Sequence, residues 1–175
     1  MVRFGLLVAA AVLVVDQASK YLIVEGLLRP DGVTQTPFFT DTVIELLPVF
    51  NLIMAWNRGV SFSLFSAESA VGQWVLVGVQ LAITAGLVWW MRKLDTRMLV
   101  VGAGMIVGGA LGNIIDRVRF GAVADFFDFH VGGWHFATFN VADACITLGV
   151  AAWLLDAFVR RPHHPPPTVN GSPHA

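Results

Sequence analysis

Residues 139–159 read FNVADACITLGVAAWLLDAFV, an apolar run long enough to cross the hydrocarbon core of a bilayer. Near its start the run carries a carboxylic acid, Asp143, three residues after Asn140. A charged side chain at the centre of a membrane helix costs roughly 2.5–3.5 kcal/mol even on lenient scales. We therefore expect Asp143 to lie near one end of a membrane-spanning helix, where water can reach it.

The composition of the whole chain also indicates a membrane protein. Of its 175 residues, 56% are hydrophobic and only 13% are charged, whereas a soluble domain is about 25% charged. A formal net charge of −1 gives no support to nucleic-acid binding. The single cysteine, Cys145, cannot form a disulfide within one chain, and we expect it to pack between helices as a small hydrophobic side chain.

Four apolar stretches predict an all-α polytopic membrane protein with four transmembrane helices. They cover residues 4–28, 71–91, 98–115 and 136–159, approximately. We predict that residues 1–161 form a single membrane-embedded domain and that the Pro-rich residues 162–175 form a disordered cytoplasmic tail. In the first stretch Asp16 interrupts the apolar run, which then resumes, and this argues against a cleaved signal peptide.

The basic residues predict the orientation of these helices. The short loop 92–97, RKLDTR, carries three of them. Arg3 precedes the first span, and Arg160 and Arg161 follow the fourth. Because cytoplasmic loops are rich in Lys and Arg, we expect both termini and this loop on the cytoplasmic side. Residues 29–70 and 116–135 then face outward. In 29–70, VIELLPVFNLIMAWN favours short strands, and SFSLFSAES favours an amphipathic segment in the outer leaflet.

Several polar residues and glycines within the spans require an explanation. Gly104, Gly108 and Gly112 recur every fourth residue, which favours close helix packing. Asp16 and Lys20 are spaced to form an ion pair, either as a purely structural feature or as support beneath an active site. A last group lies on one face of the third span, where it forms either an interfacial Asp–Arg pair or a set of donors for a peptide backbone: Asn113, Asp116 and Arg117.

Two carboxylic acids from different segments, Asp125 and Asp143, are both predicted at the water–lipid boundary. Held close together, two carboxylates cannot both ionise cheaply, so they share one proton. Such a pair serves either an aspartic peptidase or the proton relay of a transporter. Other chemistries lack their motifs: there is no HExxH, no GxSxG and no glycine-rich phosphate loop, and His130 and His135 lack helical metal-site spacing.

Five blocks, in order, resemble the lipoprotein signal peptidase family, also called signal peptidase II. They are DQASK (16–20), NRGVSF (57–62), GGALGNIIDR (108–117), VADFFDF (123–129) and FNVADACI (139–146). The resemblance implies a multi-pass aspartic endopeptidase of the bacterial inner membrane that removes the signal peptide of diacylglyceryl-modified prolipoproteins. It implies cleavage before the lipidated cysteine, an active site facing the periplasm, inhibition by globomycin-type peptides and no cofactor or metal. It also implies four transmembrane helices with a small outward-facing β-cradle and an interfacial helix, which we expect from residues 29–70.

The resemblance assigns roles to individual positions. It implies a catalytic dyad of Asp125 and Asp143. Substrate-binding positions are Asn57, Asn113, Arg117 and Asn140, and supporting positions are Asp16, Lys20, Gly59 and Asp116. Asp128 matches no dyad position, and we interpret it as an outward surface acid. Ala137 stands where the family often has Pro, and Ala144 stands where it often has Ser. Neither departure removes a dyad carboxylate, so we expect activity to survive.

Three other functions compete with this prediction: a carrier, a structural subunit and a different type of intramembrane peptidase. A small proton-coupled carrier would show inverted repeats and carboxylates near the midplane of the membrane. No convincing repeat occurs, and both candidate acids lie near span ends. A structural subunit of a larger complex would tolerate neutral substitution of both acids. A presenilin-type peptidase would require a GxGD motif, which this sequence lacks.

Overall fold

The computed structural model describes residues 1–34, 36, 40–59 and 70–159. Two predicted features therefore lie outside the described residues: the amphipathic segment SFSLFSAES, expected as the interfacial helix, and the disordered tail 162–175.

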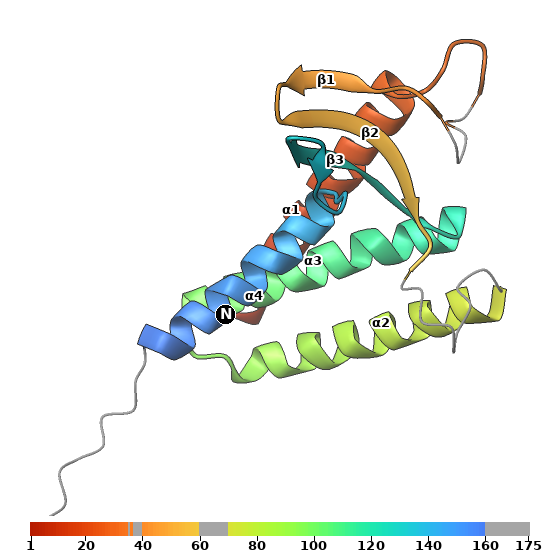
Figure 1. The fold of residues 1–175 in the computed structure, drawn as a ribbon. Coiled ribbons are helices and arrows are strands. Elements are labelled where there is room, and N and C mark those ends of the chain that lie inside the picture. Colours follow the sequence, from red (N-terminus) through yellow and green to blue (C-terminus); the bar gives the residue numbers. More distant parts are fainter. Residues whose placement is uncertain (35, 37–39, 60–69, 160–175) are drawn as a thin grey trace, which may run out of the picture.

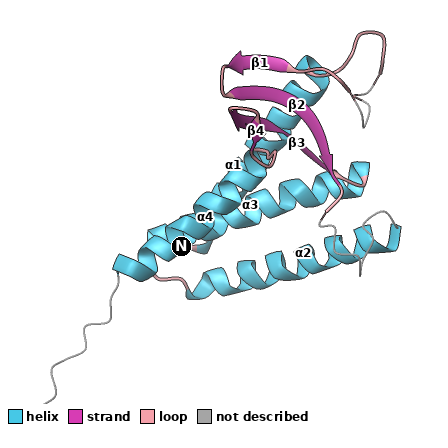
Figure 2. Ribbon diagram, in the orientation of Figure 1, coloured by secondary structure: helices cyan, strands magenta, loops and turns pink. Residues whose placement is uncertain are grey.

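Four long helices confirm the predicted fold class (Figures 1 and 2). They are α1 (Val2–Lys20), α2 (Ala70–Trp90), α3 (Arg97–Phe120) and α4 (Val141–Val159). A π-helical segment, η1 (Tyr21–Leu27), continues α1, and a short 3-10 turn, η2 (Met91–Lys93), follows α2. Each of the four long helices is sufficiently long and apolar to cross a membrane.

The fourth helix begins later than the sequence suggested. The predicted span starts near residue 136, but α4 begins at Val141. The preceding residues are extended, because Phe139 forms a β-bridge with Phe127 and the side chain of Asn140 accepts a hydrogen bond from the first turn. Asp143 consequently lies in the first turn of α4, and not about two turns along it.

A four-stranded antiparallel sheet lies at one end of the helices (Figures 1 and 2). Its order follows the chain: β1 (Ile44–Leu47), β2 (Phe50–Asn57), β3 (Val123–Val131) and β4 (Trp134–His135). Only half of it comes from residues 29–70, where we had expected the whole β-cradle. The other half, β3 and β4, comes from residues 123–135, which include the block VADFFDF. Alternate residues of this block pack into the core beneath the sheet, and its backbone pairs with β2.

Helix α3 packs between α1 and α4, and glycines permit this close approach. A Cβ atom added at Gly104 or Gly108 would come within 2.5 Å of a backbone oxygen of α1. One added at Gly109 would come within 2.5 Å of the backbone oxygen of Ala142 in α4. The packing predicted for the glycine ridge is therefore confirmed, and α3 carries a second glycine face directed at α4.

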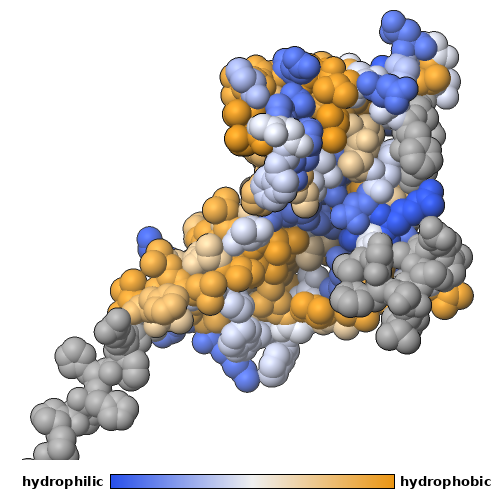
Figure 3. All heavy atoms as spheres, in the orientation of Figure 1, coloured by the Kyte–Doolittle hydropathy of each residue, from blue (hydrophilic) through white to orange (hydrophobic). Residues whose placement is uncertain are grey.

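The outer surface of the helices is apolar (Figure 3). Large hydrophobic side chains such as Leu7, Val14 and Phe158 are about two-thirds or more exposed, at 68%, 67% and 73%. Such extensive apolar exposure is unusual for a protein surrounded by water and is typical of a surface in contact with lipid. Together with the helix lengths, it makes the chain a multi-pass membrane protein.

Candidate active site

The two acids of the predicted dyad come together between β3 and α4. Asp125 lies in β3 and is 1% exposed, and Asp143 lies half-buried in the first turn of α4. The β3 register places Asp125 opposite Ala55 of β2. The pairing of two strands that are far apart in sequence, and the start of α4, therefore bring the acids together.

Asn140 connects both acids. Its side-chain Oδ1 accepts a hydrogen bond from the backbone N–H of Asp143 (2.9 Å), and its backbone N–H donates to Oδ2 of Asp143 (3.3 Å). This reciprocal arrangement is a capping box that starts α4. The Nδ2 group of Asn140 also donates to Oδ1 of Asp125 at 2.7 Å. One asparagine therefore starts the helix, orients Asp143 and holds Asp125.

Two further amides complete the hydrogen bonding of the acids. Asn57 donates from Nδ2 to Oδ2 of Asp125 (3.1 Å), and Asn113 donates from Nδ2 to Oδ1 of Asp143 (2.7 Å). Within the described part of the chain, neither acid forms an ion pair. The pair is therefore held by neutral donors, which orient the carboxylates without cancelling their charge.

This environment changes the acidity of Asp125. Burial, followed by the negative charge of Asp143, raises its pKa to about 7, although hydrogen bonds from Asn57 and Asn140 and the charge of Lys20 oppose the rise. Because the two acids interact, they titrate as a pair. Near neutral pH the arrangement can therefore hold one proton, leaving one acid able to donate a proton and the other able to accept one.

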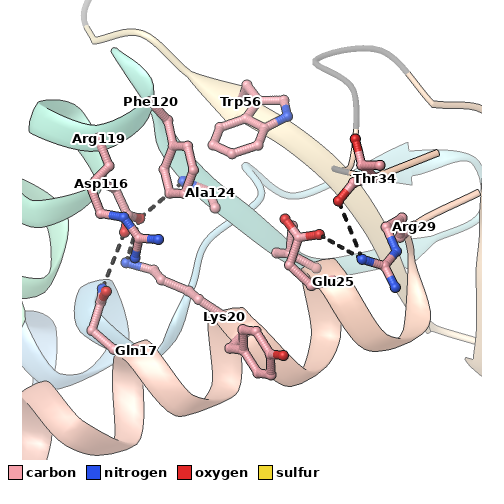
Figure 4. A pocket seen from close by; sticks show the side chains of 12 residues that line it. Gln17, Lys20, Glu25, Arg29, Thr34, Trp56, Asp116, Arg119, Phe120 and Ala124 are labelled. Carbon is pink, nitrogen blue, oxygen red and sulfur yellow. Dashed lines mark hydrogen bonds and ion pairs between the residues drawn. The ribbon is translucent and has the colours of Figure 1, made fainter.

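A second group of charged residues is connected to the pair through Asn113, and two of its members, Lys20 and Asp116, are shown in Figure 4. Lys20 forms ion pairs with Asp16 (Nζ to Oδ2, 2.9 Å) and with Asp116 (Nζ to Oδ2, 2.7 Å), and it donates to Oδ1 of Asn113 at 3.2 Å. The predicted Asp16–Lys20 pair is confirmed. The predicted alternative of an Asp116–Arg117 pair is not formed, because Asp116 faces Lys20. Arg117 instead donates from Nη1 to Oε1 of Gln80 (3.2 Å) in α2.

The ion-pair group also holds the backbone next to each acid of the dyad. Oδ1 of Asp16 accepts from the N–H of Ala142 (2.9 Å), and Oδ2 of Asp116 accepts from the N–H of Ala124 (3.2 Å). These alanines immediately precede Asp143 and Asp125. Sequence reasoning missed another member, Gln17, whose Nε2 lies 3.2 Å from an oxygen of both Asp16 and Asp116. Its only sequence signal was its place beside Asp16 in the DQASK block.

Arg117 and Gly59 have distinct local environments. Arg117 lies within electrostatic reach of Asp143 and Asp125, and its Nε is buried without a hydrogen-bond partner among the described residues. Gly59 has a φ of +104°, which a side chain would disfavour. Its N–H donates to Oδ1 of Asn57 at 2.9 Å, so this turn orients the amide that reaches Asp125.

The interpretation of Asp128 as an outward surface acid was wrong. Asp128 is 1% exposed, and both of its carboxylate oxygens lie within 3.0 Å of Nδ1 of His135. Asn51 also donates to Asp128 at 3.4 Å. Strand alternation and the β3–β4 hairpin direct it inward beneath His135.

Ala137, which stands where the family often has Pro, is exposed and lies before the start of α4. In the described ranges, no group of three His, Cys, Asp or Glu residues could hold a metal ion.

The fold and this geometry define a class: a multi-pass membrane protein with a pair of carboxylic acids, one buried and one half-buried, at one end of its helices. Comparison with known proteins then identifies the family. A sequence profile described as signal peptidase (SPase) II matches residues 8–159, and the chain belongs to this family, as its motifs indicated.

Individual relatives agree with this assignment. The lipoprotein signal peptidase of Methylorubrum extorquens (strain PA1) is 44% identical over 170 residues, covering 97% of this chain and 94% of the relative. That of Methylobacterium sp. (strain 4-46) is 46% identical and covers 87% of each chain. Among solved structures, a bacterial membrane enzyme determined at 1.9 Å resolution matches with a TM-score of 0.73 and 26% identity, covering 90% of this chain and 94% of that one.

Proposed function

We propose that this protein is an aspartic endopeptidase that removes the signal peptide from diacylglyceryl-modified prolipoproteins, cutting before the lipidated cysteine. The observation that carries the proposal is the pair Asp125 and Asp143. These acids come from different elements, β3 and α4, and are joined through Asn140. They form no ion pair among the described residues, and one of them has a pKa near 7. Family membership supports the choice of substrate.

The proposed reaction uses one proton shared by the two acids. The ionised carboxylate removes a proton from water as the water oxygen attacks the scissile carbonyl carbon. The protonated acid donates its proton to the carbonyl oxygen, so a tetrahedral diol forms. The diol then collapses: the C–N bond breaks, the leaving nitrogen takes a proton from the acid that received one, and the diol returns a proton to the other. The dyad is thereby restored without a metal or cofactor.

The four polar positions predicted to bind substrate divide into two groups. Asn113 and Asn140 already use their amides to hold the acids, so we assign them to orienting the dyad. Arg117 has a buried Nε without a partner in the described part of the chain. Asn57 also donates to Asp125, but it is exposed at the end of β2, where a substrate backbone can reach its side chain. We assign these two to contacts with the substrate backbone. Globomycin-type inhibitors would occupy the same position.

The proposed location is the bacterial inner membrane, with both termini cytoplasmic and the active site facing the periplasm. The basic residues Arg92, Lys93 and Arg97 lie at the ends of α2 and α3 remote from the sheet and the acids. The positive-inside rule directs that end to the cytoplasm. A diacylated cysteine stays in the bilayer, so its peptide bond is presented near the headgroups, at the level where β3 meets α4.

The rival functions fit this geometry less well. A carrier needs its carboxylates near the midplane, but Asp143 lies in the first turn of α4, next to the sheet. A structural subunit needs no pair of interacting acids that are held by asparagine amides. We therefore prefer the peptidase.

The test is cleavage of a purified diacylglyceryl-modified prolipoprotein in detergent. Asp125→Asn and Asp143→Asn should each lower the rate by about 10³-fold or more, because each removes one partner in proton transfer. Asp128→Asn is the matched control, since it neutralises the other buried acid of β3 without touching the dyad. Thermal melts must show that each variant folds. Normal cleavage by either dyad variant, or a folded wild type without activity, would refute the proposal.

A further inference from the structure

A cavity of about 270 Å³ with both polar and apolar walls lies beside Lys20 and Asp116 (Figure 4). Lys20 and Asp116 form part of its wall, but neither acid of the dyad lines it. The other walls come from η1, from the end of α3 and from β2. The cavity is therefore next to the candidate active site without being part of it.

The cavity offers a cationic group that forms no ion pair within the described part of the chain. Arg119, in the last turn of α3, forms no ion pair with any residue that the structure describes, and its guanidinium lies 4.9 Å from the ring centroid of Phe120. Lys20, by contrast, already contacts two carboxylates and an amide. Arginine presents a planar set of donors that matches the oxygens of a phosphate group. Arg119 is accordingly the group in this cavity that is available to an anion.

A weakly held carboxylate faces the same space. Glu25 of η1 pairs with Arg29 at 3.6 Å, and the two side chains are 26% and 42% exposed, so solvent screens their attraction. Tyr21 and Glu25, both in the π-helical segment η1, line the cavity. Figure 4 shows Glu25 and its contact with Arg29. π-Helical turns occur often at functional sites. The cavity therefore combines a free guanidinium with an acid that can exchange its partner.

The surroundings point to a lipid and not to a soluble ligand. Tyr21, Trp56 and Phe120 line the cavity, and aromatic side chains of this kind gather at membrane–water interfaces. Val14 and Leu7 precede Tyr21 by one and two heptads, so they lie on the same helix face. They are 67% and 68% exposed. An acyl chain could follow this face into the bilayer. The cavity itself is smaller than the roughly 300–1,000 Å³ of typical ligand pockets, so it suits a headgroup alone.

We propose that this cavity binds the headgroup of a membrane phospholipid that carries a phosphate and an amine. Arg119 binds the phosphate, Glu25 binds the ammonium group, and the acyl chains lie along the exposed face of α1. The proposal is independent of the peptidase reaction and would stand if that reaction were refuted.

Native mass spectrometry of the delipidated full-length protein in detergent tests this site. The probes are phosphatidylethanolamine, phosphatidylglycerol with the same acyl chains, and free phosphoethanolamine. The variants are Arg119→Gln and Glu25→Gln, and the control is Arg97→Gln, which removes a cation from the opposite end of α3. Melting temperatures establish that all four proteins fold.

The expected pattern separates the contributions of the groups. Arg119→Gln should weaken binding of both lipids at least about tenfold, since it removes a charge-assisted contact. Glu25→Gln should weaken phosphatidylethanolamine several-fold and leave phosphatidylglycerol unchanged, and Arg97→Gln should match wild type. Equal lipid binding by wild type and Arg119→Gln would overturn the site. Equal affinity for both lipids, or binding of free phosphoethanolamine as tightly as its lipid, would overturn the proposed ligand.

Discussion

Two neighbouring pairs of carboxylic acids in this protein differ in what surrounds them. Asp16 and Asp116 share the ammonium group of Lys20, at 2.9 and 2.7 Å. Asp125 and Asp143 receive hydrogen bonds from asparagine amides and form no ion pair in the described part of the chain. A cation allows two acids to remain ionised together, whereas neutral donors leave their repulsion in place. The first pair can therefore organise structure, and the second can hold a transferable proton.

The two regions are also connected. Asn113 accepts from Lys20 through Oδ1 (3.2 Å) and donates to Asp143 through Nδ2 (2.7 Å). The backbone contacts of Asp16 and Asp116 hold the residues that precede Asp143 and Asp125. A disturbance of the cation-balanced pair should therefore reach the dyad, and substitutions can separate the two effects.

The largest effect on stability should come from removing the cation. Lys20→Met leaves Asp16 and Asp116 buried without compensation and should destabilise the protein by roughly 3–5 kcal/mol. Thermal or denaturant unfolding in detergent measures this loss. The double variant Lys20→Met/Asp116→Asn should recover part of it, because one of the unpaired charges is then absent. If Lys20→Met unfolded like wild type, the stability of the protein would not depend on the charge balance of Lys20, Asp16 and Asp116.

The dyad should make its own contribution to the pH dependence of stability. The native state keeps the Asp125 proton up to a pKa of about 7, whereas the unfolded chain releases it near 3.8. The native state thus binds more protons in this window, so stability should fall as pH rises from about 4 to 7, by roughly 1.4 kcal/mol per pH unit from this group, and stay level above it. Asp125→Asn should lack this slope. A parallel pH profile for wild type and the variant would contradict the raised pKa.

Activity should respond to the same titration at higher pH. Above pH 7 the shared proton is lost, so the cleavage rate should fall by up to about tenfold per pH unit. A rate that stays constant to pH 9 would show that the dyad does not need this proton.

Packing substitutions should distinguish the two regions at smaller cost. Gly108→Ala places a methyl group against the backbone of α1, which carries Asp16, and Gly109→Ala places one against α4, which carries Asp143. Each should cost about 1–3 kcal/mol by overpacking. Gly109→Ala should lower cleavage more, since it displaces the helix of the dyad. Gly86→Ala in α2 is the control, because nothing lies within 4 Å of the added Cβ, and it should stabilise slightly. Equal cleavage by both α3 variants would contradict this separation.

The smallest effect should come from a cap that is remote from both regions. Thr96 accepts a hydrogen bond from the N–H of Leu99 at the start of α3 (3.1 Å). Thr96→Ala should cost about 1 kcal/mol of stability. Its pH–activity profile should match that of wild type. A shifted profile would mean that general loss of stability, and not local geometry, alters the dyad.

Much of the architecture could be predicted, and the errors share a cause. The four helices, the glycine packing and the Asp16–Lys20 pair were confirmed. The sequence pattern that predicts each of them lies within a single helix. The start of α4, the burial of Asp128 and the strand formed by residues 123–131 were not foreseen. Each of these depends on β-pairing between separate segments: with β2 for the strand 123–131, and within residues 127–139 for Asp128 and the start of α4.

The sequence by itself determined the class of protein and its family, because apolar run length and the five motif blocks are properties of the linear chain. Only the tertiary structure decided which acids obtain a cation and which do not. Lys20 meets Asn113 and Asp116 across more than ninety residues, and Asp125 meets Asn57 through the pairing of β2 and β3. Electrostatic environment depends on distance in space and on burial, and spacing along the chain specifies neither for groups on separate elements.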